Sequence, residues 1–133
     1  MTVAISRLLL EQIMTLARSS RDEICGLLLG RPDDITAILP ADNVAPDPAR
    51  HFELDPARLL SAYRDARTGG PQVVGHFHSH PSGRPVPSAT DAACAVPDGR
   101  LWLIVTGETA RLWIAGPGEG GATAFVEAAL DVR

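Results

Sequence analysis

Two histidines one residue apart, His78 and His80, constrain the fold of this chain more than any other feature, together with Asp91 eleven residues later. On an extended segment, side chains at positions i and i+2 project from the same face, so the two imidazoles point the same way. A carboxylate returned by a short loop completes a set of two nitrogens and one oxygen. Such a set is typical of an open zinc site of the catalytic kind, with a fourth position left for water.

The segment between the histidines and Asp91 supports this interpretation. Residues 81–87 read PSGRPVP, and three prolines and a glycine exclude regular structure there. The following Ser88-Ala89-Thr90-Asp91 has the pattern of a capping box, with Ser88 at the cap of a short helix. Capping needs no metal, but a fixed first turn also gives Asp91 a defined direction. On spacing alone, a metal site and an incidental pair of histidines both stay open.

A hydrolase built on a metal site also needs a general base. Glu23 is the candidate because it begins an otherwise apolar run, EICGLLLG, whose length and final glycine are typical of a buried strand. Burial would raise the pKa of the Glu23 carboxyl group, and a nearby divalent cation would lower it. From this segment alone, a solvent-facing glutamate at a strand end is the favoured alternative.

The rest of the chain predicts a single mixed α/β (α+β) domain over residues 1–133, in which a central mixed sheet is flanked by two main helices. The helices are expected at about 7–18, capped by Ser6, and from Pro56 to the Thr68-Gly69-Gly70-Pro71 stop, capped by Asp55. Ser88 starts a third, short helix through about residue 95. Strands are expected at 3–5, 23–30, 35–39, 72–78, 101–106 and 111–115, with a last strand or mixed element at 124–132.

Composition narrows the function classes. The formal net charge is −4, so no basic field exists to hold nucleic-acid phosphates. No apolar run approaches the roughly 20 residues that a membrane span requires. The N-terminus lacks the features of a signal peptide, and we therefore expect a cytoplasmic protein. Cys25 and Cys94 form no metal motif and are expected to be reduced, packed thiols, with a disulfide between them as the lesser alternative.

Taken together, the motifs resemble those of the JAMM, or MPN-plus, metalloproteases. That pattern is a glutamate on an early strand, then His-x-His, seven residues, a serine, two residues and an aspartate. The matching residues here are Glu23, His78, His80, Ser88 and Asp91. The combined motif is far more specific than any of its parts.

The resemblance extends over nearly the whole chain. The Cys25-Gly26 pair in the run after Glu23 is similar to the first motif of the family. Asn43 and the stretch 51–56, HFELDP, also stand where such domains carry similar residues.

The resemblance implies an MPN-type domain with a layout like that of cytidine deaminases. It implies that His78, His80 and Asp91 bind Zn²⁺. Glu23 would take a proton from the attacking water and pass it to the leaving amine, and Ser88 would stabilise the oxyanion by a hydrogen bond. The implied substrates are peptide or isopeptide bonds after the C-terminal Gly-Gly of a ubiquitin-like or sulfur-carrier protein, and a homodimer is compatible with the family.

Departures and alternatives remain. His76 stands where many members have a large aromatic residue; we interpret it as a packed or surface residue, and we do not count His51 as a ligand. The connections at 39–51 and 91–101 lack the insertions of relatives specific for ubiquitin chains. A RadC-like protein linked to DNA repair shares a similar stretch around Pro81, and a non-catalytic MPN scaffold is the other alternative. A nucleoside deaminase would need a Pro-Cys-x-x-Cys pair, which is missing.

Overall fold

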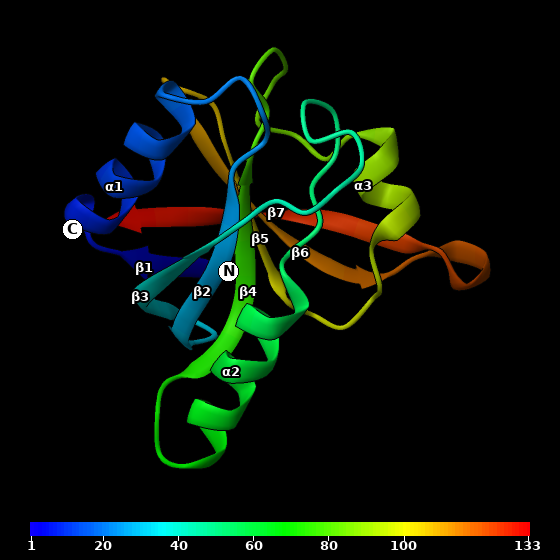
Figure 1. Ribbon diagram of the computed structural model, residues 1–133. Coiled ribbons are helices and arrows are strands. Elements are labelled where there is room, and N and C mark those ends of the chain that lie inside the picture. The colour runs from blue at the N-terminus through cyan, green and yellow to red at the C-terminus, as the bar shows by residue number, and fades with distance from the viewer.

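The computed structural model describes residues 1–133, and its helices and strands follow one another along the chain in the predicted order (Figure 1). None of the helices is long and apolar enough to cross a membrane. The α-helices are α1 (Arg7–Arg18), α2 (Pro56–Arg67) and α3 (Ala89–Cys94). The strands are β1 (Thr2–Ile5), β2 (Cys25–Arg31), β3 (Asp34–Ala41), β4 (Gln72–Ser79), β5 (Leu101–Val105), β6 (Ala110–Pro117) and β7 (Thr123–Val132), and a 3₁₀ turn spans Glu119–Gly121.

The strands form one mixed sheet in the order β1-β3-β2-β4-β5-β6-β7. β4 runs parallel to β5, and β1 runs parallel to both β3 and β7, whereas the other neighbours are antiparallel. Because β1 pairs at both of its edges, the sheet closes on itself. The mixed sheet was predicted; the closure was not, since it depends on pairing between the two ends of the chain.

The core lies between α1 and the sheet. Ser6 begins α1 by accepting a hydrogen bond from the Leu9 amide, and the apolar side of the helix packs onto the strands. In Figure 1, α1 and α2 lie at separate ends of the strands β2 and β4, and α3 lies on the far side from α1. The buried core residues include Val3, Ile5, Ile13, Met14, Ala17, Leu28, Ile35, Phe77, Leu103, Val105 and Leu112.

The register between β2 and β4 positions the site. Cys25 is paired with His78, so the chain just before β2 lies beside the end of β4. The pairing continues past the strand: the Ser79 amide donates to the Ile24 carbonyl over 3.0 Å, and the Ile24 amide donates to the Ser79 hydroxyl oxygen over 2.9 Å. Glu23 is thereby brought next to His80, although the two are 57 positions apart in the sequence.

The predicted elements are present with small shifts at their ends. β2 begins at Cys25, so Glu23 precedes this strand, and the prediction that it starts the strand was wrong. β6 continues to Pro117, and the last element is a strand throughout, from Thr123 to Val132. These ends are set by pairing with neighbouring strands, which the local sequence does not determine.

Candidate metal centre

The end of β4 delivers the two histidines. His78 and His80 are both buried and project to one side, as predicted for alternating residues, and their Nε2 atoms lie 3.2 Å apart. Ser79 between them points the other way and accepts the Ile24 amide. The prediction that both imidazoles face one point is therefore confirmed.

The first turn of α3 delivers Asp91. Ser88 is the N-cap, its hydroxyl oxygen accepts from the Asp91 amide over 3.0 Å, and the Ser88 amide donates to Asp91 Oδ2 over 2.9 Å. The capping box is therefore complete. The same Oδ2 atom lies 3.2 Å from His78 Nε2 and 3.1 Å from His80 Nε2. One carboxylate both fixes the helix start and faces the two imidazoles.

The separations among these three atoms fit a tetrahedral cation. Ligand atoms that sit 2.0–2.1 Å from a tetrahedral Zn²⁺ are about 3.3 Å from one another. The three measured separations, 3.1 to 3.2 Å, are close to this value. His78, His80 and Asp91 therefore present two nitrogens and one oxygen already spaced for a shared cation.

Glu23 completes the arrangement. Its side chain is only 6% exposed, and its Oε1 atom is buried without a hydrogen-bond partner. One ligand atom each of Glu23, His78 and His80 lie within 4.8 Å of one another. A buried carboxylate oxygen with no partner is costly, and it fits a place where a cation or a reacting water is expected. The alternative of a solvent-facing glutamate was wrong.

In the chain without a cation, the pKa values of the four site residues are shifted in different directions. Burial raises the pKa of Glu23 to about 7, although the His80 charge opposes this. Burial lowers the pKa of His78. For His80, burial acts to lower the pKa, but hydrogen bonds to Asp91 and to the Arg84 carbonyl outweigh it and the pKa is raised. Burial would raise the pKa of Asp91, but hydrogen bonds from both histidines hold it well below its usual range.

The proline-rich loop orients His80. The Nδ1 atom of His80 lies 2.7 Å from the Arg84 carbonyl oxygen, which can only accept a hydrogen bond. Nδ1 therefore carries a proton, and in the neutral imidazole this leaves the Nε2 lone pair available for a cation shared with Asp91. The Trp113 indole in turn donates to the Pro85 carbonyl over 3.0 Å and ties this loop to β6. The contacts of Arg84 and Trp113 could not be predicted from residue types, because any residue offers a backbone carbonyl acceptor.

A cluster of aromatic rings packs around His78. The ring of Phe52 stacks on the imidazole with centroids 4.2 Å apart and an interplanar angle of 18°. His76 belongs to the same cluster, with 4.3 Å between the centroids of its ring and that of Trp102. Burial, with the His78 charge next, lowers the pKa of His76 to about 3. His76 is thus a packed neutral residue, and neither it nor His51 joins the ligand atoms that converge.

The cysteines are not joined to each other. Cys25 is buried, and its thiol lies 3.6 Å from the Ala41 carbonyl oxygen. Burial, followed by the Asp42 charge, raises the pKa of Cys25 to about 11. Cys94 is exposed, so the expectation of a packed thiol holds for Cys25 and was wrong for Cys94.

Comparison with known proteins decides the family. A family model described as "Prokaryotic homologs of the JAB domain" matches residues 6–116. The chain belongs to this prokaryotic JAB-domain family. The predicted JAMM/MPN-plus membership and the single α+β domain class are thereby confirmed.

Individual relatives agree with the family model. The chain is 41% identical to a protein of Haloferax volcanii named "Desampylase" over 68% of its own length and 69% of the relative's. It is 34% identical to a "Desampylase" of Pyrococcus furiosus over 78% and 74% of the two chains.

Solved structures show the same fold. A protein of Desulfitobacterium hafniense, solved in solution, has a TM-score of 0.81 and 27% identity, over 100% of this chain and 93% of that one. A crystal structure of a JAB1/MPN domain protein from Archaeoglobus fulgidus has a TM-score of 0.59 at 24% identity, over 98% and 99% of the two chains.

Proposed function

We propose that this JAMM-type metalloprotease uses Zn²⁺ to hydrolyse the peptide or isopeptide bond after the C-terminal Gly-Gly of a ubiquitin-like or sulfur-carrier protein. The observation that carries the proposal is the convergence of two imidazoles and one carboxylate beside a second, unpartnered carboxylate. A structural zinc site would instead be closed by four protein ligands.

The donor set fits zinc. His78 and His80 offer imidazole nitrogens, Asp91 offers a carboxylate oxygen, and zinc accepts both donor types readily in tetrahedral sites. When bound, a zinc ion supplies a Lewis acid that polarises a carbonyl group and lowers the pKa of water. We assign His78, His80 and Asp91 as its protein ligands and leave Glu23 outside this set, because the Asp91 oxygen is the one at 3.1–3.2 Å from both imidazoles.

Glu23 is proposed as the general base. Burial raises the pKa of Glu23 to about 7 in the chain without a cation, and a bound cation would lower it again; a carboxylate in this range can accept a proton from water and give it to a departing amine near neutral pH. Its Oε1 atom makes no hydrogen bond within the protein, so it is free to hold that proton. Ser88 is proposed to donate to the oxyanion: its hydroxyl oxygen accepts from the Asp91 amide, which leaves the hydroxyl hydrogen available.

A groove next to Glu23 is the proposed path for the substrate tail. It has a volume of about 750 Å³ and runs between the end of α1, the chain before β2 and the end of β3. Its lining includes Asp22, Glu23, Cys25, Asp42, Asn43, Asp55 and Arg58. Two glycines can approach such a wall closely because they carry no side chains. The two relatives named "Desampylase" support a small ubiquitin-like modifier as the substrate.

A cleavage assay tests the proposal. The protein is incubated with a small ubiquitin-like carrier extended by a few residues beyond its Gly-Gly end, and the products are weighed by mass spectrometry. We expect one cut after the second glycine, loss of cleavage with chelator and recovery with Zn²⁺. A matched carrier ending in Ala-Ala should be cut poorly. Cleavage elsewhere in the carrier, or undiminished cleavage in excess chelator, would contradict the proposed function.

Three further predictions belong to this proposal. We propose a cytoplasmic location, which the two free cysteines support because reduced thiols are usual in that compartment. We propose that residues 1–133 act as one domain, since a single apolar cluster joins α1 to the strands. A homodimer stays a prediction.

A further inference from the structure

We propose that Asn43 is a positioning residue that holds Glu23 in the orientation it needs as a base, an inference that rests on the proposed function. Asn43 follows β3, in the segment that leads to α2, and it is half-buried. Its side chain bonds the backbone of Glu23 and the backbone of the segment 44–53 at the same time.

All the hydrogen-bonding capacity of the Asn43 amide group is directed at backbone. The Nδ2 group donates to the carbonyl oxygens of Glu23 and His51, each over 2.9 Å. The Oδ1 atom accepts from the amides of Ala45, over 3.0 Å, and Glu53, over 3.1 Å. Backbone acceptors and donors that are satisfied by one planar group lose most of their freedom to move relative to one another.

Glu23 depends on these contacts because its own backbone groups make no hydrogen bond to the sheet. It lies two residues before β2, and the bonds to β4 end at the neighbouring Ile24. Its carbonyl oxygen accepts from Asn43, and its amide donates to the Pro48 carbonyl over 2.8 Å. The carboxylate has no partner at Oε1, so nothing else fixes the direction of this oxygen.

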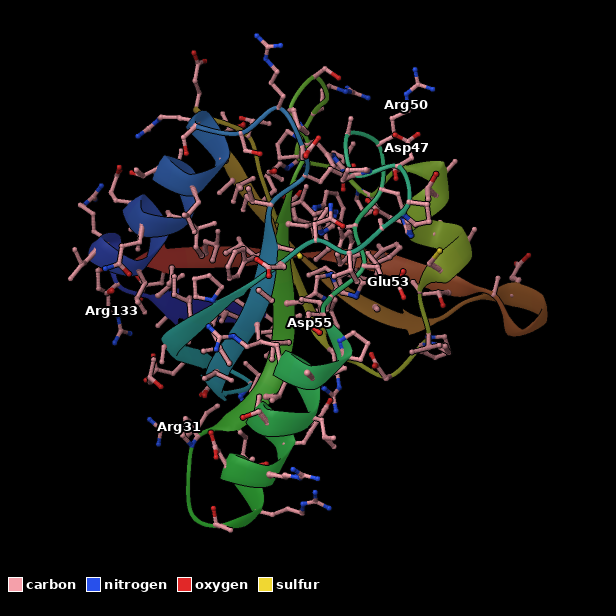
Figure 2. The ribbon with its side chains drawn as sticks, in the orientation of Figure 1. Arg31, Asp47, Arg50, Glu53, Asp55 and Arg133 are labelled. Carbon is pink, nitrogen blue, oxygen red and sulfur yellow. The ribbon has the colours of Figure 1, made fainter.

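The same segment supports a proposed ligand. Residues 44–53 carry Phe52, whose ring stacks on His78 at 4.2 Å between centroids. Figure 2 shows Asp47 and Arg50 at the outer end of this segment and Glu53 and Asp55 where the chain returns to α2. Asn43 is therefore hydrogen-bonded both to the backbone of Glu23 and to the segment that carries Phe52.

An asparagine side chain suits this position because it offers both a donor group and an acceptor atom to the backbone. Aspartate has nearly the same shape, but its second oxygen would face the Glu23 and His51 carbonyl oxygens with no hydrogen to share. Asn43→Asp therefore breaks the contacts made by Nδ2, which include a longer one of 3.4 Å to the Pro48 carbonyl oxygen, and keeps the two made by Oδ1. Asn43→Ser is a second variant with a smaller side chain, for use if the aspartate prevents folding.

A double-mutant cycle with Glu23→Gln separates positioning from general stability. In the wild-type background we expect Asn43→Asp to lower kcat by about 10- to 100-fold, since a displacement near 1 Å has this effect. KM and the zinc content should stay nearly unchanged. In the Glu23→Gln background the same substitution should lower the residual kcat by less than about 3-fold. An equal loss in both backgrounds, or a loss confined to KM or zinc content, would overturn the inference.

A measurement independent of activity separates the inference from the proposed function. Amide hydrogen exchange at Glu23, whose N–H is bonded to Pro48, should speed up in Asn43→Asp. Ser6→Ala is the matched control, because it removes a side-chain cap on α1 without touching Glu23. Failure of the wild type to cut any Gly-Gly carrier would refute the proposed function, and unchanged exchange at Glu23 in the Asn43 variants would refute the positioning role.

Discussion

The carbonyl oxygen of Arg84 accepts a hydrogen bond from His80 Nδ1 over 2.7 Å, and this contact places the proton of the neutral imidazole on Nδ1 while Nε2 lies 3.1 Å from Asp91 Oδ2. A rigid loop is needed for such a contact, because a backbone carbonyl can point correctly only if its chain is fixed. Prolines on both sides of the loop supply part of that rigidity, and Trp113 supplies another part by binding the Pro85 carbonyl.

Trp113→Phe should therefore weaken the metal site from a distance. It removes the indole hydrogen bond to Pro85 and keeps an aromatic ring, although a smaller one. We expect zinc affinity to fall by up to about 10-fold, with a stability loss of about 1 kcal/mol. Competition with a chromogenic chelator measures the affinity. Arg111→Ala is the matched control, because Arg111 lies over the Trp113 ring, 5.1 Å from its centroid, and its guanidinium hydrogen bonds go to Glu127 and not to the loop. Equal losses in both variants would contradict the explanation.

Asp91 and Ser88 can be separated experimentally, although they share a capping box. Asp91→Asn keeps an oxygen that accepts the Ser88 amide, so α3 should still form. The charge that faces the two imidazoles is lost, and zinc content should fall from about one per chain to well below half. Elemental analysis of protein purified without chelator measures this. Full zinc content in Asp91→Asn would remove Asp91 from the proposed ligands.

Ser88→Ala should have the opposite effect on zinc content, which it should leave unchanged. It removes the hydroxyl oxygen that accepts the Asp91 amide and costs about 1 kcal/mol as a lost helix cap. Zinc should be retained because no ligand changes. If the hydroxyl also donates to the oxyanion, kcat should fall by about 100-fold. A loss in kcat no larger than the fraction unfolded would leave Ser88 with the capping role alone.

The parts of the site that could be predicted from sequence are those encoded locally. Alternation along β4 places His78 and His80 on one face, and the capping box fixes the direction of Asp91 within three residues of Ser88. The stiff loop between them leaves few ways to connect the two elements. Each of these inferences needs only neighbouring residues.

The remaining parts depend on pairing over long distances. Glu23 is buried because Cys25 pairs with His78 and because Pro48 and Asn43 bond its backbone, none of which the run after Glu23 reveals. Closure of the β-sheet likewise depends on pairing between β1 and β7, which lie at opposite ends of the chain. The family pattern identified Glu23 only because it summarises such long-range contacts in other proteins.

The glycine at position 26 is required because its neighbours leave no space for a side chain. A Cβ atom at this position would lie 2.6 Å from the Leu39 carbonyl oxygen and would collide with the Phe77 ring. Backbone and a fully buried ring cannot move aside cheaply, so Gly26→Ala should cost about 1–3 kcal/mol or more. Urea unfolding measures this. Gly116→Ala is the control, because a Cβ atom there would lie 3.9 Å from the Ala124 carbonyl oxygen, an ordinary contact, and we expect no loss of stability.

The raised pKa of Glu23 predicts a specific pH dependence of stability in protein stripped of divalent cations. The pKa rises from 4.5 for a free side chain to about 7 in the folded chain. Protons are then bound more tightly by the folded state, so the contribution of Glu23 is fully present below pH 4.5 and is lost as pH rises through 7. Glu23→Gln carries no ionisable group at this position, so it should equal the wild type near pH 4.5 and exceed it at pH 8 by on the order of 2–3 kcal/mol. Urea unfolding of both proteins in excess chelator, at several pH values, measures the difference. Shifts of groups that do not interact with Glu23 cancel because both proteins share them, whereas His80 loses the part of its raised pKa that the Glu23 charge supplies. A difference that does not change between pH 4.5 and 8 would show that the Glu23 carboxylate is not destabilised by burial.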